Sequence, residues 1–196
     1  MGRVRDHVGP DFVLLLDVGY RWRDVEQAIR CVQRLDEFDL FFVEAPLFPD
    51  DLEDYRRLVP AVRTPIAGAE ILTSHAEFLG LLQTGDIAVV QPGTSRLGIT
   101  ETDRLARSAR ERGRRLVTYG WSATTFTTAA NLHVAQVNDN VPLVEYAPPS
   151  FYPDFVLRRD LSGPEPTIVD GVFEVPSAPG LGVEIDDDAL QRLRVA

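Results

Sequence analysis

Apolar and amphipathic segments alternate along most of the chain. Six short runs rich in Val, Leu, Ile, Ala and Phe are each continuous, which is typical of parallel strands covered on both faces. Between them, apolar residues recur every three or four positions, as on one side of a helix. The pattern therefore predicts six strands separated by helices. The strands are predicted at residues 13–17, 40–44, 65–70, 87–91, 115–119 and 142–145.

The helical segments have recognisable beginnings. Residues 23–35 are apolar at Val25, Ala28, Ile29 and Val32, and Asp50-Asp51 places acids in the first turn of the next helix. Thr73 or Ser74 can cap the helix that follows. Five helices are predicted between the strands, at 23–35, 50–58, 73–82, about 100–112 and about 125–137, with a helix end before a turn within residues 1–11.

Three of the predicted strands end in a carboxylate. Asp17, Glu44 and Glu70 are 27 and 26 residues apart, which is the length of one βα unit. Successive parallel strands end at the same edge of a sheet, so these acids are expected to converge. Carboxylates that crowd together need a counter-charge, and a hard divalent cation supplies one. The alternative is that each acid is a solvated residue at a strand end.

Two architectures fit six strands alternating with helices: an open doubly wound sheet and part of a (β/α)8 TIM-type barrel. The first strand is followed by Asp17-Val18-Gly19-Tyr20, which is not a glycine-rich phosphate loop, so the dinucleotide-binding fold loses its main support. Acids at the carboxyl ends of successive strands are where barrel enzymes place their chemistry. We therefore predict an α/β partial barrel over residues 1–146.

The alternation of predicted strands and helices ends after residue 146. Residues 147–196 contain many prolines and glycines, which predicts an irregular C-terminal segment with short strands near 155–157 and 172–175. A last helix is predicted at residues 186–193. Its three aspartates, residues 186–188, could suggest a metal cluster, but acids in the first turn of a helix explain them more simply.

Composition narrows the classes of function. A net charge of −10 without a basic stripe argues against nucleic acid as a partner. No apolar run approaches a membrane span, and residues 1–7 lack the apolar stretch of a signal peptide, so a cytoplasmic protein is expected. The single cysteine, Cys31, fits a reducing compartment. All 20 basic residues are arginine, which excludes lysine as a base or Schiff-base former.

Several motifs, taken in order, resemble the enolase superfamily, in particular its mandelate racemase and muconate lactonizing enzyme branch. The motifs are Leu-Asp17, Phe-Val-Glu44-Ala-Pro46, Ile-Ala-Gly-Ala-Glu70, Val-Val-Gln91-Pro92, Leu97-Gly98-Ile99-Thr100, Gly120-Trp121 and Pro179-Gly180-Leu181-Gly182-Val183-Glu184. The resemblance implies that Asp17, Glu44 and Glu70 are the ligands of one Mg²⁺. That ion would polarise a substrate carboxylate and stabilise the enediolate left when the α-proton is removed.

The chain also departs from the family pattern. The resemblance implies that the first two βα units, their Lys-x-Lys motif and an N-terminal capping domain are missing, and that residues 147–196 would pack back toward that domain. Tyr119 and Gly93 occupy the positions of the family's His–Asp dyad, so Tyr119 is the only nearby substitute for a base. Glu145 matches a glutamate that hydrogen-bonds the substrate.

Two interpretations remain open. In the first, the chain is a divergent Mg²⁺-dependent barrel domain of racemase or acid-sugar dehydratase type, acting on a small carboxylate. In the second, it is a non-catalytic remnant or gene fragment that survives through association with another chain, including a homo-oligomer, because an incomplete barrel exposes sheet edges and apolar interior.

Overall fold

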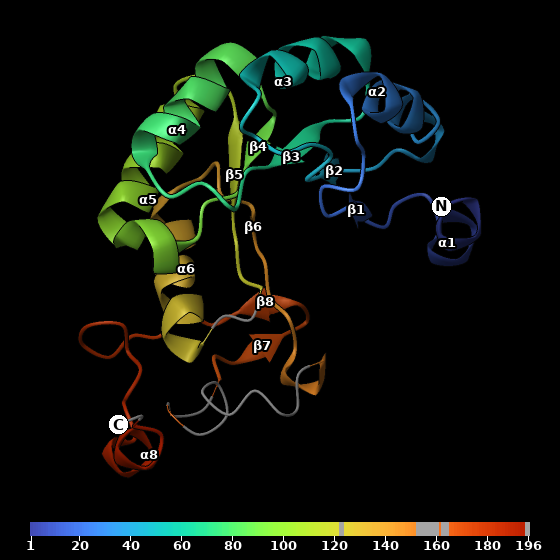
Figure 1. Ribbon diagram of the computed structural model, residues 1–196. Helices are drawn as coiled ribbons and strands as arrows, with labels where there is room; N and C mark the ends of the chain where they lie inside the picture. Colours follow the sequence, from blue (N-terminus) through green and yellow to red (C-terminus); the bar gives the residue numbers. More distant parts are fainter. Residues whose placement is uncertain (122–123, 152–160, 162–164, 195–196) are drawn as a thin grey trace.

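The computed structural model describes residues 1–121, 124–151, 161 and 165–194, and its centre is one curled parallel sheet (Figure 1). Its strands are β1 (Leu15–Asp17), β2 (Phe42–Glu44), β3 (Ile66–Gly68), β4 (Val89–Val90), β5 (Arg115–Thr118) and β6 (Leu143–Val144). Each strand pairs in parallel with the next along the chain. This sequential order, without a reversal, confirms the partial barrel and excludes the doubly wound sheet.

Helices connect the strands and cover the outer side of the sheet (Figure 1). The α-helices are α1 (Gly2–Val8), α2 (Val25–Gln33), α3 (Leu52–Leu58), α4 (His75–Gly80), α5 (Thr94–Arg110), α6 (Thr125–Val137) and α8 (Asp187–Arg192). Short 3-10 turns are η1 (Asp36–Phe38), η2 (Val59–Ala61) and η4 (Pro149–Phe151), and η3 (Leu81–Gly85) is a π-helical turn. Within the described part of the chain, no helix has the length and apolarity needed to cross a membrane.

The helix starts follow the predicted capping chemistry. Asp24 accepts a hydrogen bond from the backbone N–H of Gln27 at 2.7 Å, and Ser74 caps α4 in the same way. Asp186 accepts from Ala189 N–H at 2.8 Å, which confirms that this acidic run begins a helix. Most boundaries differ from prediction by two residues or fewer, and the largest difference is at α5, which begins at Thr94 rather than near residue 100 because a first turn precedes a break at Gly98 (φ 76°).

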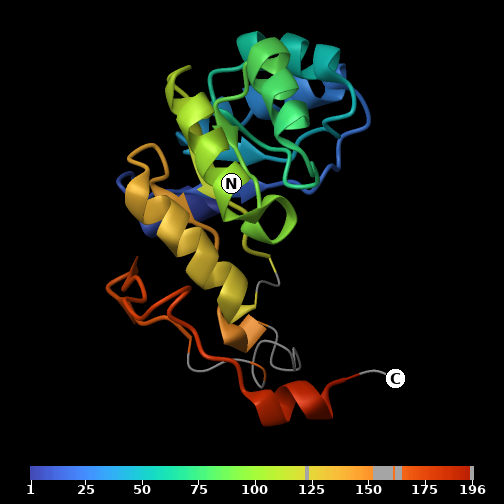
Figure 2. The same ribbon diagram turned by 90° about the vertical axis from the view of Figure 1, so that its left-hand side faces the viewer.

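The C-terminal segment forms an antiparallel hairpin, β7 (Ile168–Val169) and β8 (Val172–Phe173), before α8. This part lies beyond α6, away from α2, α3 and α4 (Figure 2). The ring of Phe173 packs edge-on against Tyr146, with centroids 5.0 Å apart, and the carbonyl of Leu181 lies 3.2 Å from His133 Nε2 on α6. The strand predicted near residues 155–157 falls outside the described residues.

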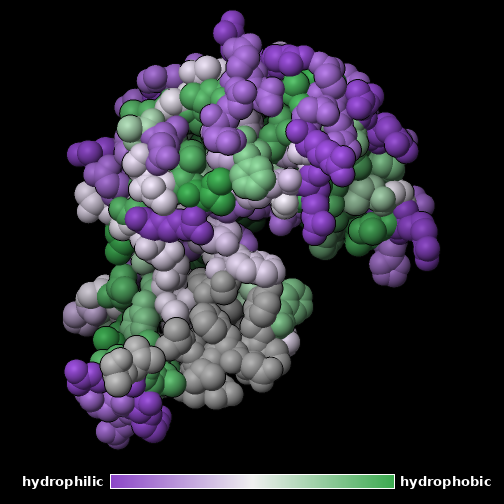
Figure 3. Space-filling model, viewed as in Figure 1, coloured by the Kyte–Doolittle hydropathy of each residue, from purple (hydrophilic) through white to green (hydrophobic). Residues whose placement is uncertain are grey.

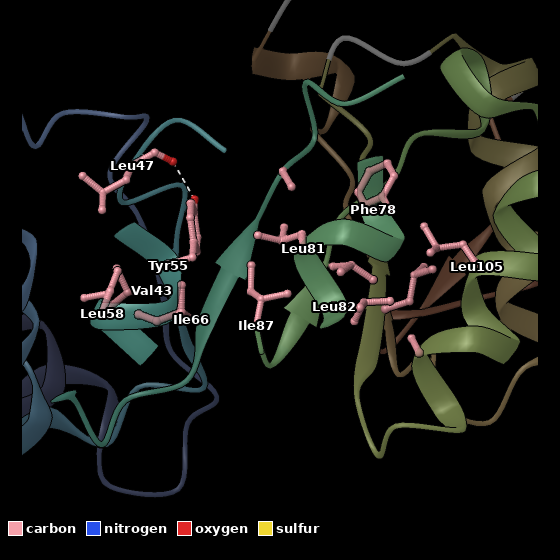
Figure 4. Close-up of a cluster of buried hydrophobic side chains, with 14 of the residues drawn as sticks. Val43, Leu47, Tyr55, Leu58, Ile66, Phe78, Leu81, Leu82, Ile87 and Leu105 are labelled. Atoms are coloured by element: carbon pink, nitrogen blue, oxygen red, sulfur yellow. Dashed lines mark hydrogen bonds between the residues drawn. The ribbon is translucent and has the colours of Figure 1, made fainter. Parts of the chain in front are cut away.

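The main hydrophobic core lies between the sheet and helices α2 to α5. Tyr55 on α3 is fully buried in this core, and its hydroxyl donates a hydrogen bond to the carbonyl of Leu47 at 2.5 Å (Figure 4). Val43 and Ile66 reach this layer from β2 and β3, whereas the exposed surface of the helices is mostly hydrophilic (Figure 3). Burial of this apolar layer holds the helices against the outer face of the sheet.

The side chain of Asp36, in η1 after α2, forms hydrogen bonds with the residues that come just before β3. Its Oδ1 accepts hydrogen bonds from the N–H and hydroxyl of Thr64 at 2.8 and 2.7 Å, and the N–H of Arg63 lies 3.2 Å away. Burial alone would raise the pKa of Asp36, but these hydrogen bonds and the Arg63 charge lower it below its usual value. The ionised form is therefore the one that the fold stabilises.

We predict that Asp36→Asn destabilises the protein by about 1–2 kcal/mol at pH 7, because an amide accepts these hydrogen bonds less well than a carboxylate. A lowered pKa contributes stability above the unfolded value, and this contribution is lost as the pH falls through the folded value. The difference between variant and wild type should therefore shrink from pH 6 to pH 3 in urea titrations. A difference that is constant with pH would contradict this role.

Candidate metal and active site

The inside of the curled sheet is built in layers, because successive side chains of a strand point to opposite faces. Phe42, Ala67, Val89 and Val117 form a small buried cluster inside the curve, with Leu15 against it. Positions two residues further along the strands face the same side. That next layer, at the carboxyl end of the sheet, consists of Asp17, Glu44, Gln91, Tyr119 and Glu145.

Asp17 and Glu44 lie side by side in this layer. They are direct register partners on β1 and β2. The Asp17 side chain is exposed, and its Oδ1 accepts a hydrogen bond from the N–H of Gly19 at 2.8 Å. Two predicted ligands are therefore adjacent at the edge strand, with Asp17 on the solvent side.

Glu44 is the most strongly perturbed carboxylate of the group. Burial first, and then the negative charges of Asp17, Glu145 and Glu70, together raise its pKa to about 7, whereas the neighbouring Gln91 amide opposes the shift. The pKa of Glu44 is thus affected by the charges of three other acids, which come from different strands or strand ends. Glu44 is therefore near enough to Asp17 and Glu70 to respond to their charges, and that these three acids share one metal ion stays a prediction.

Glu70 reaches the group from the turn after β3. Its oxygen Oε2 is buried and has no hydrogen-bond partner among the described residues. The Tyr20 ring stacks on Phe48, with centroids 4.5 Å apart, and its hydroxyl faces Glu70. Burial and the Glu70 carboxylate raise the pKa of Tyr20, so the phenol remains protonated. One carboxylate oxygen of Glu70 thus has no hydrogen-bond partner in the described part of the chain, although the Tyr20 hydroxyl lies close enough to interact with this carboxylate.

The turns that carry these acids are conformationally strained. Tyr20, Ala45 and Ala69 have φ angles of 59°, 49° and 75°, in the left-handed region that side chains other than glycine rarely adopt. Ala45 and Ala69 directly adjoin Glu44 and Glu70. Such outliers persist where the surrounding structure holds them, and they concentrate at functional sites.

Glu145 closes the group on the side of β6. Its Oε2 accepts a hydrogen bond from the backbone N–H of Gly120 at 2.8 Å. Burial raises the pKa of Glu145, the Gly120 N–H opposes this, and the charges of Glu70 and Asp17 add to the increase. A Cβ at position 120 would lie 2.0 Å from the Glu145 carbonyl oxygen, so only glycine fits there without movement of the two strand ends.

Tyr119 lies in the same layer, but its surroundings do not make it a base. Burial raises the pKa of its phenol, and the charges of Glu145 and Glu70 raise it further. The guanidinium of Arg96, 5.7 Å from the centre of the Tyr119 ring, lowers it only in part. Tyr119 therefore keeps its proton at neutral pH and can donate a hydrogen bond or a proton.

The charge balance of this site is negative. None of the four carboxylates takes part in an ion pair within the described residues. Buried oxygens of Tyr20, Glu70 and Gln91 also lack hydrogen-bond partners there. This set of oxygen donors suits a hard divalent cation such as Mg²⁺. No three His, Cys, Asp or Glu side chains of the described chain, however, are arranged as a finished coordination shell.

Sequence reasoning identified Asp17, Glu44, Glu70, Tyr119 and Glu145 but gave no role to Gln91. The feature of the sequence that could have identified Gln91 is a polar residue at the end of an apolar strand, two positions after Val89. The other residues singled out lie elsewhere or at the rim: Trp121 is 53% exposed, and Cys31 is half-buried on α2.

Comparison with known proteins agrees with this geometry. Residues 1–189 match the family described as enolase C-terminal domain-like. The chain therefore belongs to this family. It is 29% identical to the D-galactarolactone cycloisomerase of Agrobacterium fabrum, over 98% of this chain and 52% of the relative. Acid-sugar dehydratases are among the other relatives that match.

Solved structures give the same assignment. A mandelate racemase/muconate lactonizing enzyme from Jannaschia sp. CCS1 superposes with a TM-score of 0.87 at 28% identity, over 100% of this chain and 48% of that one. A racemase from Streptomyces coelicolor A3(2) with bound magnesium gives 0.83 at 28% identity, over 99% and 50%. The chain thus spans about half the length of the proteins that it matches.

We predict that Glu44→Gln stabilises the protein in EDTA at pH 8 by about 1–3 kcal/mol. A carboxyl whose pKa is raised to about 7 holds its proton in the folded state, so its contribution to stability falls as the pH rises from about 4.5 to 7. At pH 5 the two proteins should differ little.

Denaturant unfolding at both pH values measures this. The control is Glu111→Gln, which removes an exposed carboxylate at the end of α5. If Glu44→Gln is no more stable than wild type at pH 8 without metal, the carboxylates do not repel one another as described.

Proposed function

We propose that this chain provides the metal-binding and carboxylate-binding part of an enolase-superfamily active site. The reaction of that site is removal of the proton next to a substrate carboxylate, in an enzyme of racemase, cycloisomerase or acid-sugar dehydratase type. The observation that carries the proposal is the layer of inward-facing acids, Asp17, Glu44 and Glu145, joined by Glu70, none of which forms an ion pair within the described residues.

Asp17, Glu44 and Glu70 are the residues that would hold the metal. They come from three consecutive strands or strand ends, and the unpartnered Oε2 of Glu70 supports this assignment. When bound, Mg²⁺ supplies positive charge that polarises a substrate carboxylate and makes the neighbouring proton more acidic. In the chain itself, strand pairing sets Asp17 beside Glu44, Glu70 follows in the turn after β3, and Ala45 and Ala69 next to Glu44 and Glu70 have positive φ angles.

The remaining residues of the layer would serve the substrate. Glu145, held by the Gly120 N–H, is placed to accept a hydrogen bond from a substrate hydroxyl. Tyr119 holds a proton that it can donate to a leaving group or to a carboxylate oxygen. Arg96, whose guanidinium lies 5.7 Å from the centre of the Tyr119 ring, would face a second acidic group of the substrate.

A proton acceptor is the part that this chain does not supply. The sequence contains no lysine, and its histidines, His7, His75 and His133, are not in the layer. The phenol of Tyr119 is protonated. We therefore propose that the 196 residues alone bind metal and carboxylate but remove a carbon-bound proton slowly. The relatives named for acid sugars favour a polyhydroxy acid as the substrate class.

A second candidate function is association with another chain. Strands β1 and β6 are the outer strands of the six-stranded sheet, and each has a neighbour on one side only. Phe12 and Val13, just before β1, are 56% and 55% exposed, and Leu143 on β6 is 37% exposed. Unpaired edges beside exposed apolar side chains favour pairing with further strands. Measurement of mass in solution tests this, because a stable monomer would count against it.

The metal site is tested by calorimetric titration of the chain with Mg²⁺. We predict that wild type binds Mg²⁺ and that Glu44→Gln and Glu70→Gln each weaken binding at least tenfold, because each removes a charged oxygen ligand. Glu111→Gln, with its exposed side chain, should bind as wild type does. Equally weak binding by wild type and Glu44→Gln would end the metal assignment.

Catalysis is tested by incubating the Mg²⁺-loaded chain with a panel of acid sugars and measuring both dehydration and deuterium uptake at the α-carbon from D2O. We predict binding with little turnover. Tyr119→Phe should lower any dehydration by about tenfold or more while leaving Mg²⁺ affinity unchanged, because the phenol is the proton donor. Rapid turnover that is unchanged in Tyr119→Phe would contradict the role given to Tyr119.

A further inference from the structure

Asn131 on α6 is a buried asparagine that connects two segments at the carboxyl end of the sheet. It is 0% exposed. Its Nδ2 donates a hydrogen bond to the carbonyl of Tyr119 at 3.0 Å, and its Oδ1 accepts one from the hydroxyl of Thr94 at 2.7 Å. Tyr119 directly follows β5, and Thr94 begins α5, the helix that follows β4. A single amide therefore links the end of β5 to the start of α5.

Packing alone does not require an amide at position 131. Asparagine is a poor helix former, and a buried amide lowers stability unless its polar atoms have hydrogen-bond partners. A leucine, which has the same branched shape, would occupy this place without needing such partners. What the asparagine adds is a fixed position of the Tyr119 backbone relative to the start of α5.

The two linked segments carry Tyr119 and Arg96, which lie against each other. Helices α5 and α6 are side by side (Figure 1), and the N–H of Arg96, in the first turn of α5, donates to the carbonyl of Gly93 at 3.0 Å. The Arg96 guanidinium lies 5.7 Å from the centre of the Tyr119 ring. A Cβ at Gly93 would lie 3.4 Å from Cδ1 of the same ring. A shift between β5 and the start of α5 would therefore separate the guanidinium from the phenol.

The side chain of Arg96 is available to a ligand. It is exposed and forms no ion pair within the described residues. A guanidinium binds a carboxylate through two parallel hydrogen bonds. The neighbouring phenol of Tyr119 keeps its proton, so it can donate a further hydrogen bond. The two side chains thus place a cation and a neutral donor beside each other.

We propose that Asn131 is a positioning residue that holds Arg96 and Tyr119 together as one recognition unit. This unit takes the second carboxylate of an acid sugar that has a carboxylate at each end. The inference rests on the metal-binding and carboxylate-binding function proposed above, and it names such diacids as the substrate class. Groups that are held in place before the ligand arrives bind it more tightly, because ordering them is not part of the cost of binding.

Binding of two acid sugars to the Mg²⁺-loaded chain tests this role. An aldarate has a carboxylate at each end, and the aldonate of the same configuration has one. Calorimetry should show that wild type binds the aldarate on the order of tenfold more tightly, because charge-assisted hydrogen bonds are added. Asn131→Leu and Arg96→Gln should both lose this preference and keep the wild-type affinity for Mg²⁺. Equal affinity of wild type for the two acids, or a full preference in folded Asn131→Leu, would overturn the proposal.

The matched control is Asn138→Leu. Asn138 is 3% exposed at the C-terminal end of α6, and its Nδ2 donates to the carbonyl of Val134 and to Oδ1 of Asp103, both at 2.9 Å. Its replacement removes a buried amide on the same helix but away from the candidate site, so the preference for the aldarate should remain. If Asn131→Leu does not fold, Thr94→Val removes the hydroxyl at the other end of the link and should lower the preference. Thr94→Ser keeps that hydroxyl and should bind as wild type does.

A second measurement needs neither metal nor ligand. In NMR spectra of the metal-free chain, nuclear Overhauser effects should connect the ring protons of Tyr119 with side-chain protons of Arg96. They should weaken severalfold in Asn131→Leu and Thr94→Val and persist in Asn138→Leu. Unchanged effects in Asn131→Leu would overturn the positioning role. If they weaken as expected but wild type binds neither Mg²⁺ nor an acid sugar, the proposed function fails while the positioning role of Asn131 stands.

Discussion

Repulsion between carboxylates that strand pairing forces together is the constraint on which the site depends. Parallel register sets Asp17 beside Glu44, and the alternation of side chains brings Glu145 to the same face of the curled sheet. The acids cannot separate without breaking strand pairs. Burial, and after it their mutual repulsion, raises the pKa of Glu44 and Glu145. A buried oxygen of Glu70 has no hydrogen-bond partner among the described residues.

The fold tolerates this repulsion because stability and chemistry occupy different layers. Between sheet and helices, fully buried side chains such as Tyr55, Leu58 and Phe78 form the main core. On the inner face of the curled sheet, a thin apolar layer around Phe42 and Val89 lies next to the layer of acids, toward the amino ends of the strands. Polar groups without partners are then concentrated where a cation or a hydroxyl-bearing ligand can satisfy them. A site of this kind is less stable empty than filled, which is the usual relation between stability and function.

The sequence was informative wherever local chemistry decides the structure. The even spacing of Asp17, Glu44 and Glu70 and the continuous apolar strands predicted the partial barrel, and caps such as Ser74 placed helix starts within a few residues. It was less informative where distant groups decide. The break at Gly98 moved the start of α5, and the effect of Gln91 on the pKa of Glu44 depends on β2, two strands away in the sheet, rather than on its own segment. The pKa of Tyr119 is likewise set by acids 26 and 49 residues away in the chain, Glu145 and Glu70.

The positive φ angles of Ala45 and Ala69 have a consequence for any attempt to engineer this protein. Glycine at either position would relieve the backbone and is the obvious change for greater thermal resistance. It would also restore freedom of rotation to the peptide next to Glu44 or Glu70, so the acids would sample more directions before a ligand arrives. A design that introduces glycine into left-handed turns would thus raise the stability of the fold. It would also make the Glu44 and Glu70 carboxylates less well oriented for a ligand.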